Sequence, residues 1–249
     1  HKGSGEDTMV LDINVKERPT GSFSFGVGYS SVDKLIGMVQ IAESNFLGRG
    51  QRLSARANIG SKSNEYDIRF VEPWLFDRPI SADIDIYKWR REYDEYTKDS
   101  IGGELGIGFP LRLDEYTRGS ITYAFDRANV TDVADTAALE IKEMMGRNVT
   151  SSITFLIKRD SRDRFWNTTS GSVNSFSFEY AGGIMGGDVY FNKYLARSGW
   201  FFPLWWDTVF MAQGRWGYVT HRSGGKLPVY QKFRIGGLNT VRGLSLIHI

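Results

Sequence analysis

The chain has 249 residues, of which 24% are charged, and its formal net charge of +2 gives no reason to expect a nucleic acid or another polyanion as partner. Its longest apolar runs fall far short of the roughly 20 residues that a membrane-spanning helix needs, which excludes a helical membrane protein. The absence of cysteine excludes a disulfide framework and any cysteine-based metal site.

Period-2 alternation of apolar and polar residues recurs along most of the chain and is the primary evidence for the fold. In residues 21–30, bulky side chains alternate with serine and glycine, the bulky ones being Phe23, Phe25, Val27 and Tyr29. After a turn at 47–50, an aliphatic face opposes a positively charged face that contains Arg52 and Arg56. Similar alternation follows at 66–70, 80–86, 101–109, 121–125, 149–157, 176–180 and 210–218. The pattern predicts about eleven strands.

The length of these stretches indicates which face is the core. Several run for about ten residues, as a tilted transmembrane strand requires, whereas soluble strands are usually shorter. The polar face suits a wet lumen, and aromatic residues near strand ends, Trp89 and Trp166 among them, suit the headgroup level of a bilayer. We therefore expect an all-β chain that forms a transmembrane antiparallel β-barrel. A soluble β protein with aromatic strand ends is the alternative.

The connections between the strands fall into two classes. Short ones are predicted as periplasmic turns at 46–50, 76–79, 110–115 and 203–207, and longer ones as extracellular loops at 129–146 and 221–243. Residues 135–145 are rich in helix formers and predict one short helix. The glycine-rich run at 182–187 lacks the ending of a phosphate-binding loop and is interpreted as a hairpin loop. The charged run KRDSRDR at 158–164 is interpreted as a solvated periplasmic turn.

Three stretches resemble the BamA branch of the outer membrane protein 85 superfamily. VKERPTGSFSFGVGYS at 15–30 resembles the end of the last periplasmic POTRA domain and the first barrel strand. ESNFLGRGQRLS at 43–54, with EYDIRFVEPWLF at 65–76, resembles the second to fourth strands. FRIGGLNTVRG at 233–243 resembles the sixth extracellular loop, whose Val-Arg-Gly tip is the hallmark of the superfamily.

This resemblance implies a truncated barrel. A barrel of this family has sixteen strands and is preceded in the sequence by several POTRA domains. About eleven of the sixteen strands are expected in this chain, and roughly the last five are expected to be absent from it. Residues 1–18 would be the end of the last POTRA domain, with a strand at about 9–18, and residues 19–243 the first part of the barrel. Residues 244–249 depart from the family pattern, which suggests an artefact in the tail.

The loop motif predicts an anchor. Its residues are Gly236, Gly237, Val241, Arg242 and Gly243. The glycines leave backbone room for the loop to fold inward, and a guanidinium can clamp carboxylates. Without the family, an exposed loop arginine explains Arg242 equally well. The resemblance favours an arginine that pins the loop to the lumen wall.

The first strand is predicted to be a template for incoming strands. An unpaired sheet edge in lipid exposes backbone groups that another strand must satisfy, and in BamA-like proteins a substrate strand is thought to pair there. The glycines would weaken this strand, and its aromatic side chains would face lipid. The predicted template residues are therefore Gly21, Phe23, Phe25, Gly26, Gly28 and Tyr29. The alternative is that these glycines only relieve crowding in a curved sheet.

The resemblance implies an outer-membrane protein assembly factor of a Gram-negative bacterium and not an enzyme. The expected partners are unfolded outer-membrane proteins, accessory lipoproteins and outer-membrane lipids, with no nucleic acid. The histidines His1, His221 and His248 lie in a terminus, a loop and the atypical tail, so we expect no catalytic, cofactor or metal site. Two alternatives remain, a secretion pore of the same superfamily and a passive diffusion porin.

Overall fold

A computed structural model describes residues 16, 18–30, 34–235 and 247–248, and long β-strands account for most of them. Eleven of these strands form one sheet, as the alternation predicted. They are β1 (Gly21–Ser30), β2 (Lys34–Phe46), β3 (Gln51–Gly60), β4 (Ser63–Glu72), β5 (Ser81–Glu92), β6 (Thr97–Pro110), β7 (Thr117–Thr131), β8 (Gly146–Asp160), β9 (Gly171–Ala181), β10 (Phe191–Pro203) and β11 (Val209–His221). Strands of 10 to 15 residues are long enough to cross a bilayer at a tilt.

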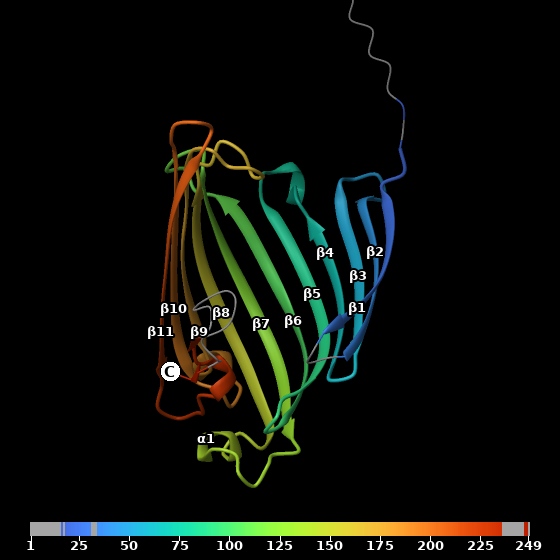
Figure 1. Ribbon diagram of the computed structural model, residues 1–249, viewed down its shortest axis with the longest axis vertical. Coiled ribbons are helices and arrows are strands. Elements are labelled where there is room, and N and C mark those ends of the chain that lie inside the picture. The colour runs from blue at the N-terminus through green and yellow to red at the C-terminus, as the bar shows by residue number, and fades with distance from the viewer. Residues whose placement is uncertain (1–15, 17, 31–33, 236–246, 249) are drawn as a thin grey trace, which may run out of the picture.

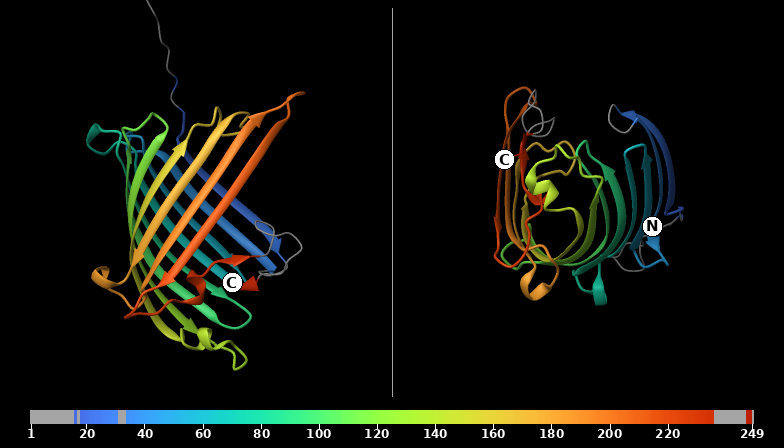
Figure 2. Two further views of the ribbon diagram at one scale, coloured as in Figure 1. Left: turned by 90° about the vertical axis from the view of Figure 1, so that its left-hand side faces the viewer. Right: turned by 90° about the horizontal axis from the view of Figure 1, so that it is seen from below.

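Each strand pairs antiparallel with its neighbours in sequence, so the sheet order runs from β1 to β11. The sheet curls into an open barrel whose two edges are β1 and β11 (Figure 1 and Figure 2). A second, two-stranded sheet joins β12 (Arg234–Ile235) to β13 (Ile247–His248). The helical elements are η1 (Leu75–Asp77), α1 (Leu139–Lys142), η2 (Gly183–Met185) and η3 (Val229–Gln231). None of the helices in the described part of the chain is long and apolar enough to cross a membrane.

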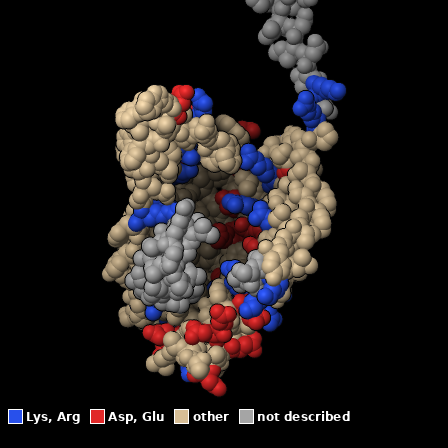
Figure 3. Space-filling model, in the orientation of Figure 1, with Lys and Arg blue, Asp and Glu red and all other residues tan. Residues whose placement is uncertain are grey.

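The outer face of the barrel is apolar because the register aligns the apolar positions of neighbouring strands. Phe23 lies opposite Ile41, and the same row continues through Ala55 and Ile68 to Ile86. Ile68 is 55% exposed and Ile86 59% exposed, values that are unfavourable in water and expected where lipid is the solvent. In Figure 3 most charged side chains gather inside the hollow and at the loop end, while the outer wall is largely uncharged.

The buried apolar residues form two clusters at the loop end of the lumen and not along the sheet. One cluster consists of Tyr96, Val130, Ala137, Ile141, Met144 and Val229. The other consists of Ala181, Val189 and Phe191. One cavity in the lumen has a largely polar lining and another combines polar with apolar side chains, so the packed core lies where the loops meet the ends of the strands.

The two ends of the barrel differ in part as predicted. The connection at 132–145 and the chain beyond β11 lie at the end opposite to the start of β1, and α1 falls within the predicted helical region (Figure 1). Length does not follow the end strictly, because the short hairpin at 61–62 lies at that same end and the longer connection at 161–170 lies at the other. The first of the short turns shows why such a connection forms. The amide of Gly50 donates to Asn45 Oδ1 at 2.7 Å, while Gly48 and Gly50 adopt φ of 72° and 70°. Glycine takes these angles without the penalty that a side chain would bring.

Candidate functional site: the edge strand and the lumen wall

The predicted template strand is an edge of the sheet. β1 pairs over its whole length with β2, from Gly21 opposite Glu43 to Ser30 opposite Lys34, and with no other strand among the described residues. Its aromatic side chains Phe23, Phe25 and Tyr29 are 69%, 68% and 75% exposed. The strand therefore combines an apolar outer face with a backbone edge that is unpaired among the described residues, as is the edge of β11 at the other side of the sheet.

The glycines of β1 differ in how much room surrounds them. A Cβ on Gly28 would meet no atom within 4 Å, and a Cβ on Gly26 would meet Met38 Cε at 3.4 Å, an ordinary contact. Only Gly21 is tighter, with Glu43 Oε2 at 3.1 Å. Crowding therefore does not require glycine at positions 26 and 28.

Beyond β11, residues 226–233 return to the inside of the barrel, and we call them the returning segment. Lys226 forms an isolated β-bridge with Val189, and the amide of Tyr190 donates a hydrogen bond to the carbonyl oxygen of Lys226 at 2.9 Å. The amide of Val229 donates to Met144 Sδ at 3.0 Å, and the Val229 side chain belongs to the buried cluster that contains Met144. The segment thus lies at the loop end of the lumen and contacts residues that precede it by 37 to 85 positions in the sequence.

A buried lysine holds the returning segment to the wall. Lys98 of β6 is 5% exposed, and its Nζ lies 3.4 Å from the ring centroid of Tyr230 and 4.5 Å from that of Trp89. Cation–π contacts become stronger when both partners leave water. Asp126, which accepts a 3.1 Å hydrogen bond from the Tyr87 hydroxyl, lines the same cavity and supplies a negative charge. Trp89 therefore faces the lumen, and its predicted place at the headgroup level is wrong. It has the same parity in β5 as Asp85 and Tyr87.

A second lysine holds the end of the segment. Lys193 Nζ donates to Gln231 Oε1 at 3.2 Å and lies 5.4 Å from the centroid of the Phe233 ring. The Phe233 ring rests on Gly217 so closely that a Cβ there would be 2.6 Å from it. Glycine at 217 is thus required by the approach of this ring to β11.

The loop motif follows this segment in the sequence, but its residues Gly236, Gly237, Val241, Arg242 and Gly243 lie outside the described residues. The predicted POTRA strand at 9–18 also lies almost entirely outside them.

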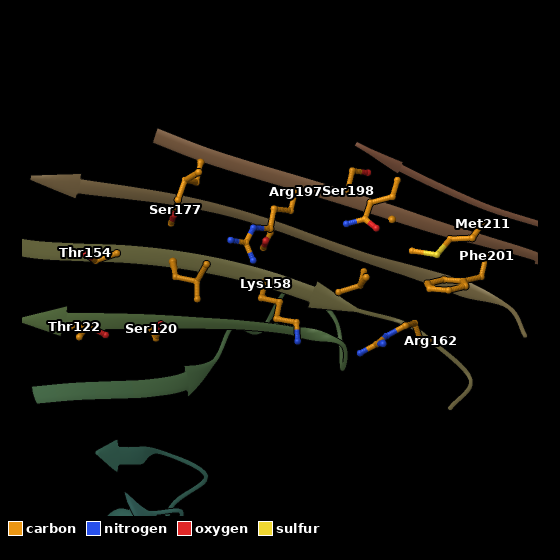
Figure 4. A pocket seen from close by; sticks show the side chains of 16 residues that line it. Ser120, Thr122, Thr154, Lys158, Arg162, Ser177, Arg197, Ser198, Phe201 and Met211 are labelled. Atoms are coloured by element: carbon orange, nitrogen blue, oxygen red, sulfur yellow. The ribbon is translucent and has the colours of Figure 1, made fainter. Parts of the chain in front are cut away.

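The lumen wall separates opposite charges. Acidic residues on β4 to β7 face basic partners or hydroxyl groups, as Asp83 does with Arg69 at 3.6 Å and Asp126 with Ser100 at 3.4 Å. Basic residues dominate the wall formed by β8 to β10, where a cavity of about 620 Å³ is lined by Lys158, Arg162 and Arg197 (Figure 4). The acidic and basic parts of the lumen wall therefore lie on different groups of strands.

The prediction of a solvated turn at 158–164 is wrong for its first half and for Arg162. Residues 158–160 are the end of β8, and Arg162 holds Asp160 through two hydrogen bonds of 2.7 Å. Both Lys158 and Arg162 line the cavity. The net charge of the run is small, but alternation along β8 places Lys158 on the lumen side and Arg159 on the opposite face, where its Nε contacts Asp114.

Two carboxylates in the turns have pKa values below the ordinary range. Hydrogen bonds from Thr169 and from the Ser170 amide lower the pKa of Asp163. The pKa of Asp114 is lowered by a hydrogen bond from Thr117 and by Arg159, whose Nε lies 2.8 Å away. These charges stabilise the turns. Among the described residues, no group of His, Cys, Asp or Glu has the arrangement of a metal site.

The long antiparallel strands, the apolar outer face and the polar lumen together define a membrane β-barrel of the outer-membrane type. A family model described as the Omp85 superfamily domain matches residues 45–248. The chain belongs to the Omp85 superfamily.

Several curated proteins resemble the chain over nearly its whole length. The outer membrane protein assembly factor BamA of Nitratidesulfovibrio vulgaris is 33% identical over 240 residues, covering 96% of this chain and 30% of that protein. BamA of Neorickettsia risticii is 27% identical, covering 100% and 33%. The sorting and assembly machinery component 50 homolog A of Xenopus laevis is 24% identical, covering 98% and 53%. The chain thus spans about a third of the length of the two BamA proteins.

A solved structure supports the same fold. The crystal structure of BamA from Haemophilus ducreyi lacking POTRA domains 1–3 superposes with a TM-score of 0.77 at 21% identity, covering 93% of this chain and 47% of that chain.

Proposed function

We propose that the chain is part of a factor that folds and inserts β-barrel proteins in the outer membrane of a Gram-negative bacterium. The observation that carries this proposal is the edge of β1, which is unpaired among the described residues and lies beside an apolar outer face. In lipid, unpaired backbone amides and carbonyls cost several kcal/mol each, so an edge strand there favours pairing with any available strand. The similarity to proteins named assembly factors agrees with this use of the edge.

In the proposed mechanism, β1 is the template. An unfolded outer-membrane protein adds its terminal strand to β1 by β-augmentation, so that main-chain hydrogen bonds give affinity and the aromatic residues Phe23, Phe25 and Tyr29 keep the new pair in lipid. Gly21, Gly26 and Gly28 lower the stability of the strand and ease its separation from a closing strand. The mechanism uses no covalent chemistry.

The loop motif has a supporting role in this proposal. Arg242 pins the loop to the lumen wall, and the returning segment, which precedes it, supports this role because it already lies against the wall at Lys98 and Lys193. The POTRA domains, which would receive substrates and accessory lipoproteins, precede the barrel, and outer-membrane lipids surround it. An Arg242→Ala protein that assembles substrates at the normal rate would refute the anchor.

Reconstitution into liposomes tests the function. We expect the protein to accelerate insertion of an unfolded outer-membrane protein into the vesicles and to give little solute flux in a swelling assay. Steady solute flux without faster insertion would favour the diffusion porin instead. Export of a soluble substrate through the vesicle wall, again without faster insertion, would favour the secretion pore.

A further inference from the structure

A transverse row of cations crosses the lumen face of β7 to β11. It begins near the turn ends of β7 and β8 and reaches the middle of β10 and β11. The strand register places Arg118 opposite Lys158, Lys158 opposite Ser175, Ser175 opposite Arg197 and Arg197 opposite Arg215. Lys158 and Arg197 line the lumen cavity, as do Ser120 and Gln213, whose alternate neighbours Arg118 and Arg215 share their face. We call Arg118, Lys158, Arg197 and Arg215 the cationic row.

Most of the cationic row has no carboxylate partner. In the described part of the chain, the single ion pair of the row joins Lys158 to Asp160 at 3.2 Å, and Asp160 is shared with Arg162. Arg118, Arg197 and Arg215 form none there. Like charges directly opposite each other destabilise a sheet, and Arg197 faces Arg215 across one strand pair. Unfavourable repulsion between neighbouring cations is typical of a surface that binds an anion.

The wall beside the row combines hydroxyl groups with apolar side chains. Hydroxyl groups line the cavity next to Lys158, Arg162 and Arg197, coming from Ser120, Thr122, Thr154, Ser175 and Ser177, and apolar side chains come from Leu156, Val173, Leu195, Phe201 and Met211 (Figure 4). The serine and threonine side chains are small, so they leave a trough between the basic side chains. A ligand in the trough would find cations at its edge and both hydroxyl donors and apolar side chains along its floor.

We propose that the cationic row binds an extended acidic peptide segment inside the lumen. Neighbouring strands lie about 4.8 Å apart, so the row extends for roughly 19 Å, which about six residues of an extended peptide would cover. Carboxylates on alternate residues of such a peptide project to one side and meet the row, while its backbone carbonyls accept hydrogen bonds from the hydroxyl floor.

The position of the row favours a peptide over a lipid headgroup. The cations point into the lumen, whereas bilayer lipids contact the opposite, apolar face of the same strands. The row lies on β7 to β11, whereas the acidic residues Asp83, Glu104 and Asp126 lie on β5 to β7. These carboxylates would repel an acidic segment, which confines it to the side of the lumen that carries the row.

Fluorescence anisotropy tests the proposal on the full chain in detergent, with a labelled peptide of about eight alternating Glu and Ser residues as the probe. We expect binding that weakens with added salt. The double variant Arg197→Gln and Arg215→Gln should lose about tenfold in affinity, the loss expected for two partly exposed charge-assisted contacts. The matched control is Arg56→Gln, which removes a cation from the lumen face of β3 opposite Asp67 and should leave binding unchanged.

A variant that keeps the charge separates binding from folding. The double variant Arg197→Lys and Arg215→Lys should retain most of the affinity for the peptide. The heat-dependent shift in gel migration that marks a folded β-barrel should be the same for all variants. Equal binding of a Lys-Ser peptide, or unchanged affinity in the glutamine double variant, would overturn the proposal. Binding of phosphatidylglycerol vesicles that depends on the row, with no peptide binding, would overturn it in favour of a lipid. None of these results bears on the template role of β1, which involves a different strand and face.

Discussion

Replacing Lys98 with methionine should release the returning segment from the lumen wall. Methionine has a similar length and volume, so the change removes the charge with little loss of packing. The amine lies 3.4 Å from the Tyr230 ring centroid and 4.5 Å from that of Trp89. Buried cation–π contacts contribute roughly 0.5 to 2 kcal/mol each, so the pair contributes about 2 kcal/mol, which corresponds to a change of about 30-fold in the local opening equilibrium.

Limited proteolysis with trypsin measures this opening, because Lys226 and Lys232 lie within the segment. When opening is faster than cleavage, the cleavage rate follows the population of the open form, and Lys98→Met should raise it by about 30-fold. Lys98→Arg is the control, since a guanidinium also stacks on aromatic rings and should keep cleavage close to the original rate. An unchanged rate in Lys98→Met, or equal rates in the two variants, would refute the role of Lys98.

Three other outcomes follow from the structure. Gly28→Ala should stabilise β1 by about 0.5 kcal/mol, because a Cβ at this position meets no other atom and alanine loses less conformational entropy on folding than glycine. Substrate insertion should then become slower, and faster insertion would contradict the proposed weakness of the strand. Phe191→Ala should destabilise the barrel by about 3 to 5 kcal/mol in urea unfolding, because its side chain is fully buried; a smaller loss would mean that the site collapses. The pKa of Asp163 is lower when folded, so its contribution is present above the ordinary Asp pKa of about 3.9 and is lost as the pH falls through the lowered value. The protection factors of the Thr169 and Ser170 amides, which are corrected for the intrinsic pH dependence of exchange, should be high at neutral pH and fall in acid, and no change with pH would contradict this.

The strands were predictable because each of their two faces meets a different solvent. Lipid outside and water inside impose alternation on every strand, and residues 21–30 were predicted with the bounds that the structure shows for β1. The residues proposed as the template all lie in this one segment, and their role stays a prediction.

The contacts of the returning segment were not predictable from the sequence. Lys98 and Trp89 gain their role from Tyr230, which is far away in the chain, and no local pattern reports such a contact. One signal was present, because Trp89 shares the parity of Asp85 on the polar face of β5.

The cationic row was hidden for a related reason. Its residues come from strands whose relative positions depend on register, and register is a property of the paired strands and their turns. In the sequence, Lys158 and Arg162 look balanced by neighbouring acids, and only the fold places Lys158 in line with Arg197 and Arg215.

Site-specific disulfide cross-linking tests the template role of β1 most directly. A cysteine at Ser24 should cross-link to a cysteine in the terminal strand of a substrate stalled during assembly, because paired strands bring the Cα atoms within the reach of a disulfide. The matched position is Gln40, which lies opposite Ser24 in β2 and is already flanked by strands on both sides. The account predicts cross-links at Ser24 and none at Gln40. Equal cross-linking at both positions, or none at Ser24, would contradict it.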